Sequence, residues 1–339
     1  MAAMIKSEKS IPEENPSLFH YTSQAGLEGI LASQTIFATH YKFLNDATEI
    51  EHFKSALAEL LEQKVFAPVK KRIKALAATS DDSKSNLNAI YRKHGGETKA
   101  IKKQIASQVN TIFRLTCENA YIASFCGWHP HAPRLNQHGL LSQWRAYGHD
   151  GGFALEFDTK ALNELFKEDG NLYDDSLSYF GNCFYDEDPK KIIAKRKAEF
   201  DFVGDFLVDF ADALATDQRR LPDAAQAAQY FFALSSQPKH PGFSEENEVR
   251  IATTVSSRSD EVIDGEPLRT RQIKFRNTAG VTVPYIELFA GLNKRLPIKR
   301  ILVGPHVDRD KRAVYVRSLL RDLPIEVTVS DIPYIAVKR

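Results

Sequence analysis

The stretch LFHYTSQAGLEGILAS, residues 18–33, is where the fold prediction starts. Residues 18–21 predict a short strand. Residues 24–33 predict a helix that follows at once, because its apolar residues Leu27, Ile30 and Leu31 fall on one side. A second strand is expected at residues 35–39. The chain therefore begins its ordered part with a strand, a helix and another strand.

Further along, strands and helices are mixed without a regular alternation of strand, helix and strand. Helices are expected at residues 142–147, 189–216, 222–236 and 308–323, and strands at residues 121–126, 153–157, 249–255, 272–276, 281–288, 300–303 and 325–329. This mixture favours an α+β fold over a doubly wound sheet. We expect a flexible tail at residues 1–17 and one domain at residues 18–339, with helical insertions at about 62–116 and 189–236.

Composition excludes several classes of protein. Hydrophobic residues make up 43% of the 339 residues, which is ordinary for a globular chain and argues against global disorder. The formal net charge is +1, so no field of the whole protein draws it to nucleic acid or to an anionic membrane. Three cysteines favour a reducing compartment, and we expect a cytoplasmic protein. No apolar run is long enough to span a membrane, and no membrane partner is expected.

Common catalytic signatures are missing from the sequence. We find neither a Walker loop nor GxGxxG, and neither a GxSxG elbow nor an HExxH helix. Cys126, His129, His131 and His138 have irregular spacing that two prolines interrupt, so we expect no metal site.

The first cluster of polar residues is His20-Tyr21-Thr22-Ser23, at the end of the first strand. A histidine can donate from one ring nitrogen and accept on the other. Thr22 or Ser23 can bond a ligand hydroxyl, or can simply cap the helix that follows. Both interpretations stay open at this point.

Two further clusters lie later in the chain. In FLND, residues 43–46, Asp46 is a candidate helix cap with Glu49 three residues on, and Asn45 is the less explained residue. Trp144 and Arg145 stand side by side and could stack on a planar ring and hold an anion. A packed indole at Trp144 and a structural ion pair at Arg145 would explain these two residues equally well.

The fourth cluster is FSEENEVR, residues 243–250. On a strand, Glu246, Glu248 and Arg250 would share one face. Two carboxylates on one face repel, so one has a raised pKa or both await a cation, while Arg250 would hold Glu248 ionised. An exposed edge strand with a salt bridge is the alternative.

Residues 70–114 form a Lys-rich helical segment with a break at Gly95-Gly96. Charge runs usually mark solvated helix faces, which predicts a solvated helical hairpin. The alternative is a basic insertion that meets a partner or a polyanion.

Taken together, these motifs resemble one family. HYTS followed by GLEGIL, then FLND, WRAYGHDGGFALEFD and FSEENEVRI, is similar to the bacterial domain of unknown function 2971 family. LPIKRILVGP and SDIPYI near the C-terminus also fit, so the resemblance runs from about Leu18 to Ile335.

The pattern of that family is similar to the ADP-ribosyltransferase superfamily. The resemblance implies a mixed split sheet with long helical insertions, and an NAD-dependent transfer of ADP-ribose to a protein or nucleic acid, as in a bacterial toxin or a phage-defence effector. It implies that His20 holds the nicotinamide ribose and that Glu248, or else Glu246, is the catalytic carboxylate. Arg145 or Arg250 would hold the pyrophosphate. The residues expected around NAD, the substrate, are His20, Tyr21, Thr22, Ser23, Asn45, Asp46, Trp144, Arg145 and Arg250.

Two other functions fit the same residues. The chain could be a non-catalytic module that binds a nucleotide or a partner on this scaffold. It could also be a nuclease that holds a divalent metal with Asp46, Glu246 and Glu248.

Overall fold

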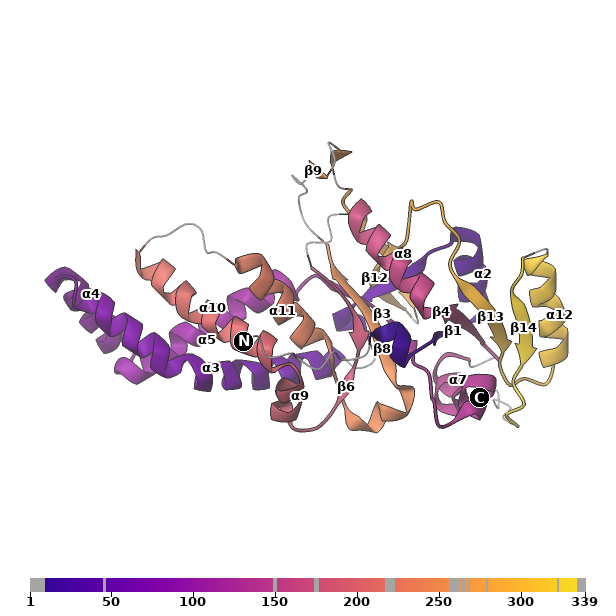
Figure 1. Ribbon diagram of the computed structural model, residues 1–339, viewed down its shortest axis with the longest axis horizontal. Coiled ribbons are helices and arrows are strands. Elements are labelled where there is room, and N and C mark those ends of the chain that lie inside the picture. The colour runs from indigo at the N-terminus through magenta and orange to yellow at the C-terminus, as the bar shows by residue number, and fades with distance from the viewer. Residues whose placement is uncertain are drawn as a thin grey trace, which may run out of the picture.

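The computed structural model describes residues 10–44, 47–148, 151–173, 177–216, 223–255, 262–263, 266–267, 269–278, 280–321 and 323–333. These residues form an α+β fold, as expected, with one large mixed sheet and helices on both of its faces. Figure 1 shows an elongated molecule, with the sheet towards one end and a helical arm extending from it. Within the described residues no helix is both long enough and apolar enough to cross a bilayer.

The large sheet has the strand order β11-β12-β2-β3-β1-β4-β13-β14, and β8 pairs with β3 and β5 beside this path. Its pairs are antiparallel except β13 with β14. The strands are β1 (Ser17–Thr22), β2 (Ile36–His40), β3 (Ala120–Cys126), β4 (Phe153–Asp158), β5 (Ser178–Asn182), β8 (Glu248–Thr254), β11 (Lys274–Thr278), β12 (Val281–Leu288), β13 (Ile298–Val303) and β14 (Glu326–Val329). Short strands outside it are β6 (Phe184–Tyr185), β7 (Pro238–Lys239), β9 (Val262–Ile263) and β10 (Glu266–Pro267).

The sheet splits at one edge of β3. Strand β8 pairs with the whole of β3 on one side. On the other side β1 pairs only at Cys126, whereas β2 pairs at Tyr121 and Ile122. Residues 123–125 lie between these two pairings, and we call this gap between β1 and β2 the split.

One face of the sheet, which we call the α8 face, is covered by three helices. They are α2 (Gln24–Ser33), α8 (Thr159–Leu172) and α12 (Arg309–Leu320). Their buried residues, such as Leu27, Leu162 and Val316, pack with strand residues such as Leu18 and Phe125. The predicted helix at residues 24–33 therefore contributes its apolar side to a core, as its periodicity indicated.

The opposite face, which we call the arm face, carries two helical groups. The arm consists of α3 (Ala47–Ala77), α4 (Asp81–Lys93), α5 (Glu97–Thr116), α9 (Pro189–Lys195), α10 (Lys197–Thr216) and α11 (Ala224–Ser236). Its core, with Leu57, Ile105, Val203 and Phe231, is continuous with Ile122 of β3. A smaller group, α6 (Pro133–His138) and α7 (Leu141–Tyr147), covers β1 and β4. The short 3₁₀ helices η1 (Tyr41–Phe43) and η2 (Pro241–Glu246) complete the fold.

Two predictions about helix boundaries have clear outcomes. The chain does break at Gly95 and Gly96, which have φ angles of 77° and 117°, in the left-handed region that glycine tolerates best. The single helix expected at residues 189–216 is wrong. The chain forms α9 and α10 instead, and Arg196 between them has non-helical backbone angles.

The flexible tail expected at residues 1–17 is also wrong for its last part. Residues 11–14 form the short helix α1 (Ile11–Glu14), which Ser10 and Glu13 cap reciprocally. Asn15 and Ser17 are buried, at 2% and 1% exposure. The side chain of Asn15 accepts from the backbone N–H of Trp128 at 2.9 Å, so this segment is held by contacts distant in sequence. Residues 1–9 lie outside the described residues.

Candidate functional site at the split of the sheet

His20 reaches from β1 across the split to the middle of β3. Its Nδ1 lies 3.1 Å from the carbonyl oxygen of Ser124. A carbonyl can only accept, so Nδ1 carries the proton and Nε2 keeps its lone pair. Burial lowers the pKa of His20, and the positive charge of Arg276 lowers it further against the opposing hydrogen bond to Ser124. At neutral pH the ring is therefore an uncharged acceptor.

Arg276 borders the same split from the side of β2. The guanidinium donates to Oγ1 of Thr39 at 3.0 Å. It also lies 5.7 Å from the ring centroids of both Phe37 and Tyr285, whose own centroids are 4.2 Å apart. Arg276 is exposed, whereas Thr39 is buried. This arrangement can hold an anion and present a flat aromatic surface beside it.

The strand register explains why these residues meet. Phe37 and Thr39 are two residues apart on β2, so their side chains point to the same face of the sheet. Tyr285 of β12 lies directly opposite Thr39, and Val283 lies opposite Arg276 of β11. Three strands thus place a cation, two rings and a hydroxyl on one patch of the arm face, near the split that His20 enters from the α8 face.

The carboxylate of Glu248 lies on the same face as this patch but four residues further along β3, because Glu248 is opposite Cys126 whereas Thr39 is opposite Ile122. Phe19 of β1 is opposite Cys126 of β3, which is opposite Glu248 of β8, so these three residues share the arm face. His20 follows Phe19 and points to the α8 face, where its ring lies 5.6 Å from that of Phe125. The convergence of His20 and Glu248 that the sequence suggested is therefore not found.

Glu248 instead belongs to a buried network of charges. Arg250 donates from Nε to its Oε1 at 2.8 Å, and the ammonium of Lys239 donates to its Oε2. Lys239 also donates to Glu246 at 2.6 Å. Glu248 is 3% exposed, and burial alone would raise its pKa. The two cations outweigh burial and lower the pKa of Glu248 to about 2.

This network bears on four expectations from the sequence. Arg250 does hold Glu248 ionised, but its own guanidinium is buried and also donates to the carbonyl of Ser236 at 3.1 Å. It therefore has no side open to a pyrophosphate. Glu246 lies on η2 and not on the strand, so period-two alternation does not place it. Lys239 stands between the two carboxylates, where a nuclease would hold its metal, and the described residues contain no cluster of three metal-ligating side chains.

Several other predicted site residues have structural roles. Tyr21 is buried, and its hydroxyl accepts from the backbone N–H of Leu140 at 2.8 Å. Trp144 is 1% exposed and packs edge-on against Tyr21, while its indole N–H donates to the carbonyl of His138. Ser23 caps α2 by accepting from the N–H of Gly26 at 3.2 Å.

The remaining predicted residues are scattered. Thr22 is half-buried at the end of β1, and Gly26 lies so close to its hydroxyl that a Cβ there would be 1.9 Å from Oγ1. Arg145 is exposed on α7. Asn45 and Asp46 lie outside the described residues.

Sequence reasoning missed four residues of the split: Phe37, Thr39, Arg276 and Tyr285. The strands that carry them were predicted, and alternation within FAT at residues 37–39 was a usable signal. Their convergence depends on the pairing of β2 with β12, which joins residues about 250 positions apart and has no local signature.

The fold and this patch define an α+β protein with a split mixed sheet and with an imidazole, a guanidinium and two aromatic rings around the split. Within this class, residues 143–251, roughly a third of the chain, match the family described as "Protein of unknown function (DUF2971)". This stretch contains the WRAYG and EVRI motifs. Searches of curated proteins and of solved structures gave no match.

Proposed function

We propose that this protein binds an NAD-type dinucleotide at the split and transfers its ADP-ribose to a protein or nucleic acid, on a sheet of the ADP-ribosyltransferase type. The observation that supports this most is the neutral imidazole of His20, fixed by Ser124 with its acceptor nitrogen free for a ligand hydroxyl. Arg276 stands beside it as an exposed cation.

The groups around the split suit the separate parts of a dinucleotide. A ribose hydroxyl can donate to Nε2 of His20. A phosphate can take the outward N–H groups of Arg276, which Thr39 holds in place. Phe37 and Tyr285 offer a ring surface against which a base can stack. A ligand with a sugar, a charge and a flat ring uses all three features.

In the transfer itself, the bond between nicotinamide and ribose breaks and nicotinamide leaves with the bonding electrons. The acceptor nucleophile bonds to the same ribose carbon and loses its proton. Positive charge develops on the sugar, and a carboxylate stabilises it or takes that proton. Glu248 is buried and neutralised by two cations, so we propose for this role Asp46, the first carboxylate after β2 in the sequence, whose position lies outside the described residues.

Calorimetric titration with NAD tests the binding step. We expect Arg276→Ala and His20→Ala each to weaken binding at least tenfold, whereas Arg295→Ala, which removes another exposed arginine, leaves it unchanged. Transfer is tested separately, by nicotinamide release and by labelling of cell extract with labelled NAD, in the wild type and in Asp46→Asn.

The outcomes separate the candidate functions. Binding with nicotinamide release that Asp46→Asn abolishes supports the full proposal. Binding without release supports the non-catalytic nucleotide-binding module and refutes the transfer. Absence of NAD binding at millimolar concentration refutes both.

A further inference from the structure

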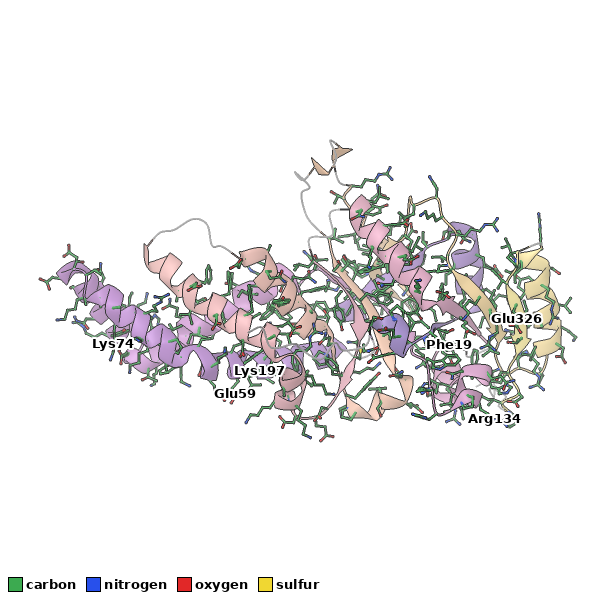
Figure 2. The ribbon with its side chains drawn as sticks, in the orientation of Figure 1. Phe19, Glu59, Lys74, Arg134, Lys197 and Glu326 are labelled. Carbon is green, nitrogen blue, oxygen red and sulfur yellow. The ribbon has the colours of Figure 1, made fainter. Side chains whose placement is uncertain are left out.

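Charge is strongly segregated along the chain. Residues 70–114 contain eleven Lys and Arg residues and three Asp and Glu residues, so this segment has a net charge of +8. The whole chain is +1, so the remaining residues together carry −7. This segment forms the end of α3, all of α4 and most of α5, which is the outer part of the arm (Figure 1). Figure 2 marks Lys74 on the arm, far from Phe19 on the sheet.

Part of this positive charge is neutralised inside the arm. Arg72 of α3 pairs with Asp209 of α10 at 3.5 Å, and Lys102 of α5 pairs with Glu62 of α3 at 2.5 Å. Lys70 pairs with Glu97 at 2.6 Å. These pairs link α3 to α5 and α10, and their carboxylates offset the charge of the cations.

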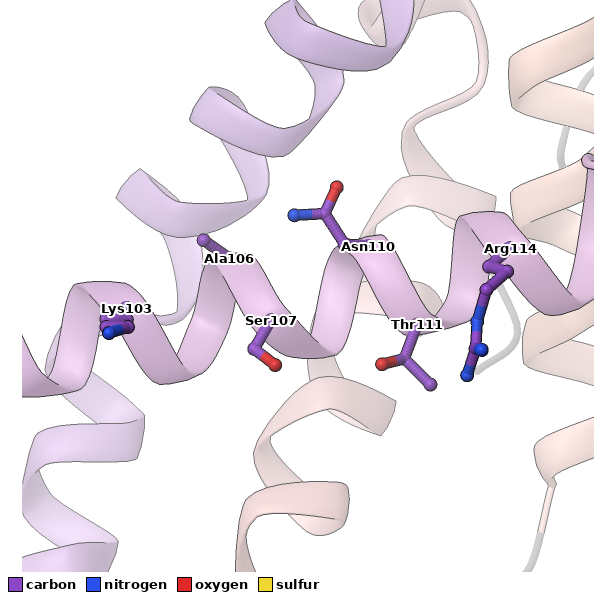
Figure 3. Close-up of a pocket in the computed structure, with 6 residues that line it drawn as sticks. All are labelled: Lys103, Ala106, Ser107, Asn110, Thr111 and Arg114. Carbon is purple, nitrogen blue, oxygen red and sulfur yellow. The ribbon is translucent and has the colours of Figure 1, made fainter.

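The outward face of α5 is different. Residues 98–117 contain no Asp or Glu. Lys103 and Arg114 are exposed, and no carboxylate of the described residues pairs with either. Between them lies a shallow hollow of about 410 Å³, which Figure 3 shows along one side of the helix. Its lining consists of Lys103, Ala106, Ser107, Asn110, Thr111 and Arg114.

The spacing on this face suits a chain of anions. Lys103 and Arg114 are eleven residues apart, or about 16 Å along a helix, which is too far for one phosphate to contact both. Two hydroxyls and an amide between them supply neutral donors of the kind that contact phosphate oxygens. The outward face of α5 therefore presents a cation at each end and neutral hydrogen-bond donors between them. Its length spans several nucleotides.

From this we infer that the outward face of α5 binds the sugar-phosphate backbone of a nucleic acid. A membrane surface fits less well. The apolar side of α5, with Ile105, Val109 and Ile112, is buried in the arm and is not available for insertion between lipids. The site lies on the arm and shares no residue with the split, so it stands whether or not the protein binds NAD.

Fluorescence anisotropy with labelled duplex DNA, single-stranded DNA and RNA of about 20 nucleotides tests this inference. We expect binding without sequence preference that weakens steeply as salt rises, because phosphate contacts release counterions. The double variant Lys103→Glu/Arg114→Glu should bind at least tenfold more weakly, and Lys103→Gln/Arg114→Gln should show a shallower salt dependence.

The matched control is Lys160→Glu/Lys167→Glu, which makes the same charge change at exposed positions of α8. It should bind like the wild type, and the circular dichroism of all three variants should match. The inference is overturned if no nucleic acid binds at low salt, if the control loses as much affinity as the α5 variant, or if anionic lipid vesicles bind while nucleic acids do not.

Discussion

The imidazole of His20 and the carboxylate of Glu248 project from opposite faces of one sheet, although a single strand, β3, separates their own strands. The two sites consequently differ in kind. His20 lies at the split near the exposed guanidinium of Arg276, whereas Glu248 is enclosed by cations that neutralise it. This difference leads to distinct expectations for substitutions at each position.

Glu248→Gln should destabilise the protein. The change leaves the buried charges of Lys239 and Arg250 without their shared carboxylate, and breaking a buried ion pair costs about 3–5 kcal/mol. Urea unfolding followed by circular dichroism measures the loss. Glu245→Gln, a change at an exposed position three residues earlier, is the control and should be neutral. An unchanged midpoint for Glu248→Gln would show that the network contributes no stability.

The lowered pKa of Glu248 predicts how the stability of the folded protein depends on pH. The pKa of Glu248 is about 2 in the folded protein, below its ordinary value of 4.5. A depressed pKa contributes stability that is complete above the ordinary value and is lost as pH falls from there towards the folded pKa. We expect the denaturation midpoint to fall between pH 4.5 and pH 2, and to fall less steeply in Glu248→Gln. Parallel pH profiles for the two proteins would contradict this.

NAD binding should depend on pH through His20. Because the pKa of His20 is lowered below 6.5, the ring stays neutral and Nε2 stays an acceptor at pH 7 and above. Affinity should be constant from pH 7 to 8 and should fall in acid as the ring gains a proton. Calorimetric titration with NAD, from pH 8 down into acid, measures this affinity. In His20→Asn the acid fall should vanish, and its persistence would assign the pH dependence to another group.

Gly127→Ala should also be destabilising. A Cβ at this position would lie 2.4 Å from the backbone oxygen of Asn247 and 2.5 Å from Oδ1 of Asn15, which is buried and held by the backbone N–H of Trp128. We expect a loss of about 1–3 kcal/mol in the free energy of unfolding. Gly29→Ala is the matched control, since nothing lies within 4 Å of its Cβ and alanine favours a helix. Equal effects of the two changes would contradict this account.

Local signals predicted much of the fold. The strand at residues 18–21, the helix at residues 24–33 and the break at Gly95 depend on side-chain spacing or backbone freedom within a few residues, and the structure contains all three. The charge segregation of the arm was also visible in the sequence. The register of β1, β3 and β8 was not, because it is set by the joint packing of both faces. A shift of one residue in that register would move Glu248 to the face of His20.

The candidate site was predictable only in part for the same reason. His20 was identified because it ends a strand before a helix cap. Lys239 was missed, since nothing near residue 239 in the sequence marks it as the partner of two carboxylates. Trp144 was assigned to a ligand because its chemistry suits stacking, but a large indole gains more by burial in the core beneath α7.

Nitrogen-15 NMR of the histidine rings and the arginine side chains during titration with NAD tests the central claim most directly. The variant His20→Asn is used to assign the His20 signals. We predict that NAD shifts the Nε2 resonance of His20 and the Nε resonance of Arg276, while the Nε resonance of Arg250, which is bound to Glu248, stays in place. Shifts at Arg250 with none at His20 or Arg276 would contradict the account, because the ligand would then lie at the buried charges around Glu248 and not at the split.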